Sequence, residues 1–434
     1  MRILILTHGT RGDVQPYAGL AWALRAAGHD ALLAGPAGLA SVAEPYGIPY
    51  APLDDGPNTL MDAPEIRAAV ETNYRGLRGK AIAMTVVRRT RPLLARVLED
   101  MAAAADGGFG GSGPDLVVHH AGMPGQHIAE KFGVPAVPAC LQPVWVPTGS
   151  FPNPMLPVRL PRALNRASYL SIRLTVRTMA GVTDRWRTGT LGLPRRRGRH
   201  DILHAPDGAA TTVLQAFSRH VLPAPLDYPP TVHTTGFWHL PAPPGWTPPP
   251  DLAAFLAAGP PPIYLGFGSM AGTDPGRIGR IAAEAVRRAG VRAVVATGWG
   301  GIDAAAFPDG VHVLDQAPHA WLFPRMAAIV HHGGSGTTAA ALASGRPQVV
   351  CPFVADQPFW ARRTHAAGVA PEPRPQCHLT PDGLAGAIRQ VRTDDVMRRR
   401  ATELGERIRA EDGAATAVRV LEQILDGAGR TPSR

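Results

Sequence analysis

The chain has 434 residues, of which 45% are hydrophobic and 18% charged, a composition typical of globular proteins and sufficient for two ordinary domains. Its formal net charge is +10, but no nucleic-acid-binding motif is recognisable, so we expect no nucleic-acid partner. No segment has the ~18–20 uncharged apolar residues of a membrane span, and the apolar run after Arg2 is too short for a signal peptide, which favours a cytoplasmic protein. Three scattered cysteines predict neither a disulfide framework nor a metal site: Cys140, Cys351 and Cys377.

The first elements predict a Rossmann-like βαβ unit. Residues 2–7 read as a buried strand, residues 8–13 (HGTRGD) as a glycine-containing turn, residues 14–27 as an amphipathic helix and residues 31–34 as the next strand. Asp13 lies where the turn meets the helix. Aspartate is favoured as a helix N-cap, and a carboxylate in this place also suits a general base facing a cleft. The spacing alone does not choose between the two.

Two further strands and a pair of helices are predicted before the middle of the chain. Residues 65–105 read as two helices, with Pro92 near a helix start. Residues 115–120 read as a strand that ends in two histidines, and residues 135–141 as a further strand. In open α/β sheets, ligands bind beyond the carboxyl ends of the strands. Contact with a bound ligand and a structural role fit His119 and His120 equally well.

Residues 159–199 are unusually basic, with eleven arginines and one acidic residue, Asp184. Residues 165–186 within this segment are predicted to form a helix. Apolar side chains occupy much of its surface. The pattern favours a solvated basic face, and the alternative is an amphipathic surface that contacts anionic lipid. Four arginines share one face of this segment: Arg162, Arg166, Arg173 and Arg177.

A proline-dense segment, residues 221–261, separates two predicted domains. Because few regular elements tolerate so many prolines, we place the inter-domain linker there. Residues 1–220 then form an N-terminal domain, and residues 262–434 form a C-terminal domain in which the strand, turn and helix pattern restarts. Trp299, in the second domain, suits either stacking on a nucleobase or a place in the core.

Residues 327–360 (AAIVHHGGSGTTAAALASGRPQVVCPFVADQPFW) predict a strand, a glycine turn, a helix, a second strand and a polar pair. The turn combines unpaired backbone N–H groups with the positive end of a helix dipole, which suits a phosphate group. Glycine also lets a ligand approach the backbone closely, although any tight turn of this kind favours glycine and serine. The paired histidines before the glycines, and Asp356 and Gln357 after the next strand, favour a ligand site.

These residues resemble the donor-binding signature of the family 1 glycosyltransferases, which have the GT-B fold. The resemblance is greatest to the bacterial branch that contains antibiotic and sterol glucosyltransferases. The loop of residues 9–16 (GTRGDVQP) likewise resembles the Gly-Ser-Arg-Gly-Asp-Val-Gln-Pro loop of sterol-type and glycopeptide-type members. The signature is His-Gly-Gly-x-Gly-Thr, Gly-x-Pro and Pro-x-x-x-Asp-Gln, and it is matched by His332, Gly333, Gly334, Gly336, Thr337, Gly345, Pro347, Pro352, Asp356 and Gln357.

The resemblance implies an α/β protein of the GT-B fold, with two Rossmann-like domains facing each other across a cleft. Residues 1–220 would bind the acceptor and residues 262–434 the nucleotide sugar, with the last helix packed back on the first domain. It makes Asp13 the general base, and it assigns the diphosphate contact to His332 rather than His331. Thr10, Arg11 and Gly12 form the acceptor loop. Residue chemistry and resemblance together predict the following donor site: Ser269, Trp299, Gln316, His319, His332, Gly333, Gly334, Ser335, Gly336, Thr337, Asp356 and Gln357.

The resemblance implies an inverting hexosyltransferase that moves a sugar from a UDP- or TDP-sugar to a hydroxyl of a hydrophobic small molecule, such as an antibiotic. Ala340 stands where plant members have a ribose-binding glutamate, so the choice between UDP and TDP stays open. The chain has no Asp-x-Asp motif. We therefore expect no metal requirement and no cofactor besides the nucleotide-sugar co-substrate.

Other readings stay open. One alternative is a sterol or membrane-lipid glucosyltransferase, and a peripheral membrane contact is part of that reading. A non-catalytic nucleotide-sugar-binding partner of another transferase is a second, and a nucleotide-sugar 2-epimerase a third. We expect a monomer or a homodimer.

Overall fold

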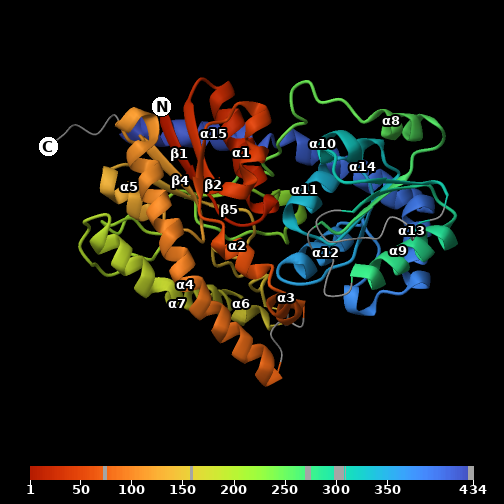
Figure 1. Ribbon diagram of the computed structural model, residues 1–434, viewed down its shortest axis with the longest axis horizontal. Coiled ribbons are helices and arrows are strands. Elements are labelled where there is room, and N and C mark those ends of the chain that lie inside the picture. The colour runs from red at the N-terminus through yellow and green to blue at the C-terminus, as the bar shows by residue number, and fades with distance from the viewer. Residues whose placement is uncertain (72–75, 157–159, 269–274, 298–306, 308, 429–434) are drawn as a thin grey trace.

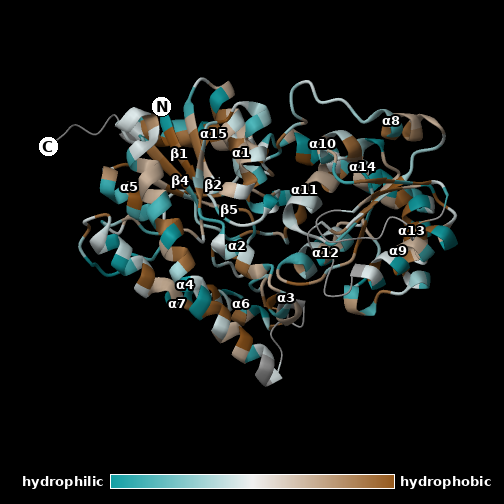
Figure 2. Cartoon of the chain, viewed as in Figure 1, coloured by the Kyte–Doolittle hydropathy of each residue, from teal (hydrophilic) through white to brown (hydrophobic). Residues whose placement is uncertain are grey.

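The computed structural model describes residues 1–71, 76–156, 160–268, 275–297, 307 and 309–428. Within them, the chain forms two parallel β-sheets that lie in separate halves of the molecule, each with helices packed against it (Figure 1). The strands are mostly hydrophobic, and hydrophobic and hydrophilic residues alternate along the helices (Figure 2). The α/β class predicted from the sequence is confirmed.

The first sheet has seven strands in the order β3-β2-β1-β4-β5-β6-β7, and every neighbouring pair is parallel. Strand order changes direction between β1 and β4, so the carboxyl ends of these two strands frame the crevice where ligands bind in such sheets. The strands are β1 (Arg2–Leu6), β2 (Asp30–Pro36), β3 (Tyr50–Leu53), β4 (Leu116–His120), β5 (Ala136–Cys140), β6 (Val213–Gln215) and β7 (Val232–Thr234).

Helices cover both faces of the first sheet. Residues of α1 pack on one face, and residues of α4, α5 and α7 pack on the other. The helices of this half are α1 (Arg11–Ala26), α2 (Gly56–Met61), α3 (Pro64–Glu71), α4 (Gly76–Gly107), α5 (Gln126–Phe132), α6 (Asn165–Ser168) and α7 (Leu170–Gly189).

The second sheet has five parallel strands in the order β10-β9-β8-β11-β12. Its direction of winding changes between β8 and β11, which places a second crevice at their carboxyl ends. The strands are β8 (Ile263–Gly266), β9 (Ala293–Ala296), β10 (Val311–Leu314), β11 (Ala328–His331) and β12 (Gln348–Val350). The helices that follow the first half are α8 (Pro250–Ala257), α9 (Pro275–Ala289), α10 (His319–Leu322), α11 (Ser335–Ala343), α12 (Gln357–Ala366), α13 (Pro381–Thr393), α14 (Asp395–Ala410) and α15 (Gly413–Ala428).

The last helix, α15, returns to the first half and packs against α1 (Figure 1). Ala417, Val418 and Leu421 are buried in the same apolar cluster as the α1 side chains. The His29 imidazole also lies 2.9 Å from a carboxylate oxygen of Glu422. The end of the chain therefore completes the core of the domain that the beginning of the chain starts.

An apolar cluster also joins the two halves. It brings side chains from the first half, such as Phe151 and Phe217, against Phe359 and Trp360 of α12. The rings of Phe151 and Phe359 have their centroids 5.4 Å apart. This buried contact holds the two sheets in a defined relative position, because apolar surface removed from water favours the closed arrangement.

Three boundaries differ from the sequence predictions. Helix α1 begins at Arg11, so Asp13 lies inside its first turn rather than at the N-cap. Pro92 lies within the continuous helix α4 rather than near a helix start. The proline-dense segment 221–261 contains strand β7, which pairs with β6, and helix α8, so its longest irregular stretch is residues 235–249, between β7 and α8.

Candidate functional site

The turn after β11 separates its two histidines into different environments. His331 is fully buried, its Nδ1 accepts a hydrogen bond from the Gly333 N–H (3.1 Å), and its Nε2 lies 2.8 Å from Gln348 Oε1. Because Nδ1 is an acceptor, Nε2 carries the proton and donates to the amide oxygen. Burial lowers the pKa of His331 to about 4. His331 is therefore a neutral residue that holds the turn in place.

His332, unlike His331, has a ring nitrogen that remains free to bind a ligand. Its Nδ1 is buried and has no hydrogen-bond partner among the described residues. A Cβ added at Gly334 would lie 2.4 Å from the His332 Nε2, and one added at Gly268 would lie 3.4 Å from its Cε1. The ring thus occupies a slot that exists because both neighbours are glycines. Burial lowers the pKa of His332 to about 3, and His331 and His319 add to the effect.

The turn leads directly into α11. Gly333 has φ +90, a conformation that favours glycine. Gly334 is the N-cap residue, and glycine has no side chain that could accept a capping hydrogen bond. The first backbone N–H groups of α11 therefore have no acceptor from the N-cap residue. Ser335, Gly336 and Thr337 form that first turn. Thr338 follows, fully buried, with its hydroxyl unpaired among the described residues. The site presents donors and the positive end of a helix dipole.

Asp356 and Gln357 open α12 beside this turn. The indole Nε1 of Trp360 donates to Asp356 Oδ2 at 2.8 Å. Burial raises the pKa of the Asp356 carboxyl to about 6, and the negative charge of Asp13 contributes to the rise. Gln357 is buried, and its Oε1 accepts hydrogen bonds from the backbone N–H of Phe353 (2.8 Å) and Val354 (3.2 Å). Only the amide nitrogen of Gln357 is then left to meet a ligand.

Asp13 lies on the opposite side, in the first turn of α1. Its Oδ2 accepts hydrogen bonds from the Thr10 N–H (2.9 Å) and the Thr10 hydroxyl (3.0 Å). Within the described chain its Oδ1 has no hydrogen bond. Gly9 is needed beside it, because φ is +132 there and an added Cβ would lie 2.5 Å from Asp13 Oδ2. One carboxylate oxygen therefore closes the helix turn and the other is free for chemistry.

The N-terminal turns of α1 and α11 meet between the two sheets. Arg11 Nη1 donates to Gln316 Oε1 at 2.7 Å, and a Cβ at Gly336 would lie 3.9 Å from the Gly12 Cα. The charge of Asp13 acts on Asp356 across this space. The structure thus brings the predicted acceptor loop and much of the predicted donor site together.

The remaining predicted residues divide into three groups. His319 stacks on Phe323 with ring centroids 4.2 Å apart, and burial, aided by Arg11, lowers its pKa to about 4. His119 is fully buried, and burial lowers its pKa to about 4, which indicates a structural role. Ser269 and Trp299 lie outside the described residues.

His120 at the end of β4 and Trp145 after β5 lie against each other in the first half of the molecule. Burial lowers the pKa of His120, and the negative charge of Asp13 opposes the change. The rings of His120 and Trp145 meet edge to face at 5.9 Å. Sequence reasoning missed Trp145; the signal available was an aromatic residue just past the carboxyl end of β5.

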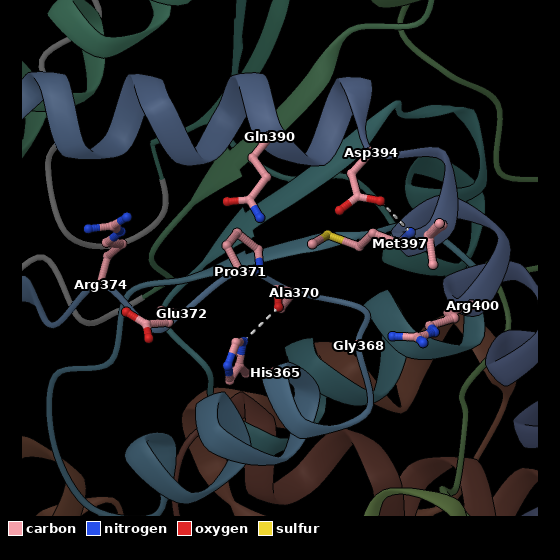
Figure 3. A pocket seen from close by; sticks show the side chains of 11 residues that line it. His365, Gly368, Ala370, Pro371, Glu372, Arg374, Gln390, Asp394, Met397 and Arg400 are labelled. Atoms are coloured by element: carbon pink, nitrogen blue, oxygen red, sulfur yellow. Dashed lines mark hydrogen bonds between the residues drawn. The ribbon is translucent and has the colours of Figure 1, made fainter.

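A separate surface pocket of about 410 Å³ lies between the end of α12 and helices α13 and α14 (Figure 3). Its lining mixes charges of both signs, as in Glu372, Arg374 and Arg400, and it contains none of the predicted site residues. His365 in its wall is engaged with the Ala370 carbonyl at 3.1 Å. We do not place the site there.

Within the described chain, no three His, Cys, Asp or Glu side chains are grouped as a metal site would need. Nor does any helix in the described part of the chain have the length and apolarity to cross a membrane.

Two facing parallel sheets, with a histidine-glycine turn at a helix N-terminus on one side and a carboxylate-bearing helix on the other, define a GT-B glycosyltransferase. Two family models match the chain: the Glycosyltransferase family 28 N-terminal domain over residues 3–146, and the Erythromycin biosynthesis protein CIII-like C-terminal domain over residues 292–424.

Similar proteins agree with these models. O-mycaminosyltylonolide 6-deoxyallosyltransferase of Streptomyces fradiae is 34% identical over 436 residues, 98% of this chain and 97% of that protein. The chain therefore belongs to this family of glycosyltransferases, and the predicted enzyme class is confirmed. Sterol 3-beta-glucosyltransferase UGT80A2 of Arabidopsis thaliana is 32% identical over 99% of this chain. The chain spans 66% of that plant protein and 30% of a sterol 3-beta-glucosyltransferase of Emericella nidulans.

Solved structures support the fold. The glycosyltransferase VinC in complex with dTDP matches 98% of this chain and 100% of its own with a TM-score of 0.65 at 21% identity. The calicheamicin glycosyltransferase CalG4 matches 100% and 99% of the two chains with a TM-score of 0.67 at 20% identity. The predicted GT-B fold is confirmed.

Proposed function

We propose that this protein transfers a sugar from a UDP- or TDP-sugar to a hydroxyl group of a hydrophobic small molecule, with inversion at the anomeric carbon. The observation that carries the proposal is the meeting of the first turn of α1, which carries Asp13, with the first turn of α11, together with the effect of the Asp13 charge on Asp356. A base and an anion-binding helix end that face each other are what a direct displacement at a sugar carbon requires.

The leaving nucleotide diphosphate is stabilised at α11. The free N–H groups of the first turn and the helix dipole offer positive potential to the charge that develops on the departing oxygen. His332 adds a donor from its slot beside Gly334, since its lowered pKa keeps the imidazole neutral with one N–H at physiological pH. No metal ion is needed in this scheme.

The sugar is oriented by the start of α12. The Asp356 carboxylate can accept hydrogen bonds from sugar hydroxyls while Trp360 holds its other oxygen in position. Gln357 offers its amide nitrogen. Together they present the anomeric carbon to the acceptor on the face opposite the diphosphate.

Asp13 removes the proton from the acceptor. Its Oδ2 is held by Thr10, and the free Oδ1 takes the proton as the acceptor oxygen forms its bond to the anomeric carbon and the bond to the diphosphate breaks. The non-catalytic reading is less favoured, since Asp13, His332 and Asp356 are all present.

The acceptor is proposed to be a secondary metabolite of the antibiotic type. Support comes from the Streptomyces fradiae relative, whose name describes sugar transfer to O-mycaminosyltylonolide and whose length this chain nearly matches. A sterol or other membrane lipid is the second candidate, supported by the similarity to sterol 3-beta-glucosyltransferases. VinC in complex with dTDP supports TDP as the first nucleotide to test.

The first test is thermal unfolding of the purified protein with UDP, TDP or GDP. A nucleotide present at ~100 times its Kd stabilises the folded protein by ~2.7 kcal/mol. Stabilisation by UDP or TDP but not by GDP supports the donor site and identifies the nucleobase that it accepts. No stabilisation by any of the three contradicts the assignment of His332 and the α11 N-terminus.

The second test separates Asp13 as a base from Asp13 as a helix cap. Asp13→Asn keeps an acceptor for the Thr10 N–H but removes the base, and we expect nucleotide binding to persist while turnover falls by ~10²–10⁴-fold. Thr10→Ala is the matched control, because it loosens the same cap and leaves the carboxylate. Wild-type turnover in Asp13→Asn would show that another group takes the proton.

A further inference from the structure

Two helices of the first half, α4 and α7, run side by side in the same direction (Figure 1). Arg91 of α4 donates to the Thr178 carbonyl of α7 at 3.1 Å, and further along the pair Thr190 of α7 donates to Glu99 of α4 at 2.7 Å. The second contact lies further toward the C-terminus of both helices than the first, so the helices are parallel. Residues that precede Arg91 in α4 therefore lie beside residues that precede Thr178 in α7. Met84 of α4 is therefore level with the first turns of α7.

These turns expose large apolar side chains to solvent. Met84 is 71% exposed, Leu174 is 61% exposed and Leu170 is 55% exposed. Single exposed apolar residues need no explanation, but three that are each more than half exposed on adjacent turns of two neighbouring helices form a patch.

Arginines are interleaved with the patch. Leu170, Arg173, Leu174 and Arg177 follow one another at three-, one- and three-residue steps, so they share one face of α7, and all four are exposed. Arg88 lies one turn after Met84 on the exposed side of α4. We call the six together the basic apolar face: Met84, Arg88, Leu170, Arg173, Leu174 and Arg177.

The charge on this face is not neutralised. Residues 76–98 contain six basic residues, residues 160–183 contain four, and neither segment contains an Asp or Glu. Arg88, Arg173 and Arg177 form no ion pair within the described chain. Other arginines of the same region are paired, as Arg187 is with Glu130 at 2.6 Å.

The face lies on the acceptor side of the candidate site. Helix α4 has 32 residues and so extends for roughly 48 Å, far beyond the short strands beside it. It runs from the carboxyl-end edge of the first sheet, where Asp13 lies, back to the start of β4. Helix α2 packs on α4, and its Asn58 donates to the Gly9 carbonyl at 2.8 Å. The contact lies near the middle of α4, where Leu93 faces Gly56 at the start of α2, so α2 links the middle of α4 to the loop that precedes Asp13.

We propose that the basic apolar face docks the protein on an anionic lipid bilayer. Leu170, Leu174 and Met84 enter the boundary between headgroups and acyl chains, and the arginines between them bind lipid phosphates. A solvated basic face, which the sequence pattern favoured, does not account for leucines at these exposures. A nucleic acid uses the arginines but not the leucines, and a symmetric contact between two copies would place arginine against arginine.

The test is co-sedimentation of the full chain with vesicles of phosphatidylglycerol and phosphatidylcholine, compared with vesicles of phosphatidylcholine alone. Binding to the anionic vesicles only, weakened by added salt, is expected. Arg173→Gln with Arg177→Gln should weaken that binding by roughly 30-fold, since each basic residue near the surface contributes about fivefold. Leu170→Ser with Leu174→Ser should weaken it by at least tenfold.

The matched control is Val396→Ser with Arg399→Gln on α14. Val396 is 46% exposed and Arg399 is also exposed, so this variant removes the same chemistry from the other half of the molecule. It should bind vesicles as the wild type does. Unchanged melting temperatures show that the substitutions leave the fold intact, as expected for exposed side chains.

Other outcomes overturn the proposal. Equal binding of the leucine double variant and the wild type, together with tight binding of single-stranded RNA that the arginine variant loses, would make the face a nucleic-acid site. A dimer that the leucine variant dissociates, with no vesicle binding by the wild type, would make it a subunit interface. The measurement uses no nucleotide sugar, so its failure is distinct from failure of the proposed transferase activity.

Discussion

Arg11, in the first turn of α1, is hydrogen-bonded to Gln316, which follows β10 of the second sheet, with 2.7 Å between Nη1 and Oε1. The two residues are 305 positions apart. Both side chains are exposed, yet they make a direct polar contact between the first turn of α1 and the second half of the molecule. It joins the two halves of the molecule beside the place where the reaction is proposed to occur.

A double-mutant cycle measures this contact. Arg11→Ala and Gln316→Ala should each lower the free energy of unfolding modestly, and their coupling should be about 0.5–1.5 kcal/mol, as for a single hydrogen bond. Urea denaturation of the four proteins gives the value. A coupling below about 0.3 kcal/mol would show that the two halves do not hold this contact in solution.

Substitutions of the two histidines in the turn after β11 should have different effects, one on stability and the other on nucleotide binding. His331→Ala leaves buried polar groups of Gln348 and Gly333 without partners, and we expect it to lower the free energy of unfolding by ~2–4 kcal/mol. His332→Ala removes no hydrogen bond of the described chain. It should change stability little but weaken binding of TDP or UDP by ~1.5–3 kcal/mol, measured by calorimetry. The opposite pattern would assign the diphosphate contact to His331.

The ionised Asp356 carboxylate should lower the free energy of unfolding of the protein without ligand. Its pKa is raised to about 6 from an ordinary value of about 3.9. Between these two values the folded state holds the proton that the unfolded state has released, so stability contributed by this group falls as pH rises through 4–6. At pH 8 the ionised carboxyl therefore destabilises the unliganded fold by up to ~3 kcal/mol.

Asp356→Asn should remove that cost. We expect the variant to melt at a higher temperature than the wild type at pH 8 and to lose most of this advantage at pH 4.5, where the wild-type carboxyl is protonated. Binding of the nucleotide sugar should weaken, and binding of the free nucleotide should persist, because the carboxylate is proposed to hold the sugar. A variant that is equally destabilised at both pH values would show that the Trp360 contact outweighs the charge.

A substitution at Leu421 tests the packing of the last helix, α15, against the first half of the molecule. It is fully buried in the cluster formed with α1, so Leu421→Ala should cost ~2–5 kcal/mol in urea unfolding. Leu170→Ala, at a side chain that is 55% exposed, is the control and should change stability by less than ~0.5 kcal/mol. Nucleotide affinity should be retained in both variants, since α15 packs on the first half.

Local requirements visible in the sequence determined the histidine-glycine turn after β11. Glycines 333 and 334 are required by a positive φ and by the slot for the His332 ring, and such requirements leave a local pattern that a sequence can display. The alternation of buried strands and helices likewise determined the α/β class. The same local reading misplaced Pro92 and the start of α1, because packing against the sheet and the capping bond of Asp13 decide those boundaries.

Only the tertiary structure decided which distant groups meet. The raised pKa of Asp356 depends on burial and on Asp13, which lies 343 residues earlier in the chain. The difference between His331 and His332 depends on Gln348 and Gly268, which belong to other strands and turns. The exposure of Leu170 and Leu174 depends on which side of α7 the neighbouring α4 covers. Burial, charge and exposure arise from residues that folding brings together, so no local pattern determines them.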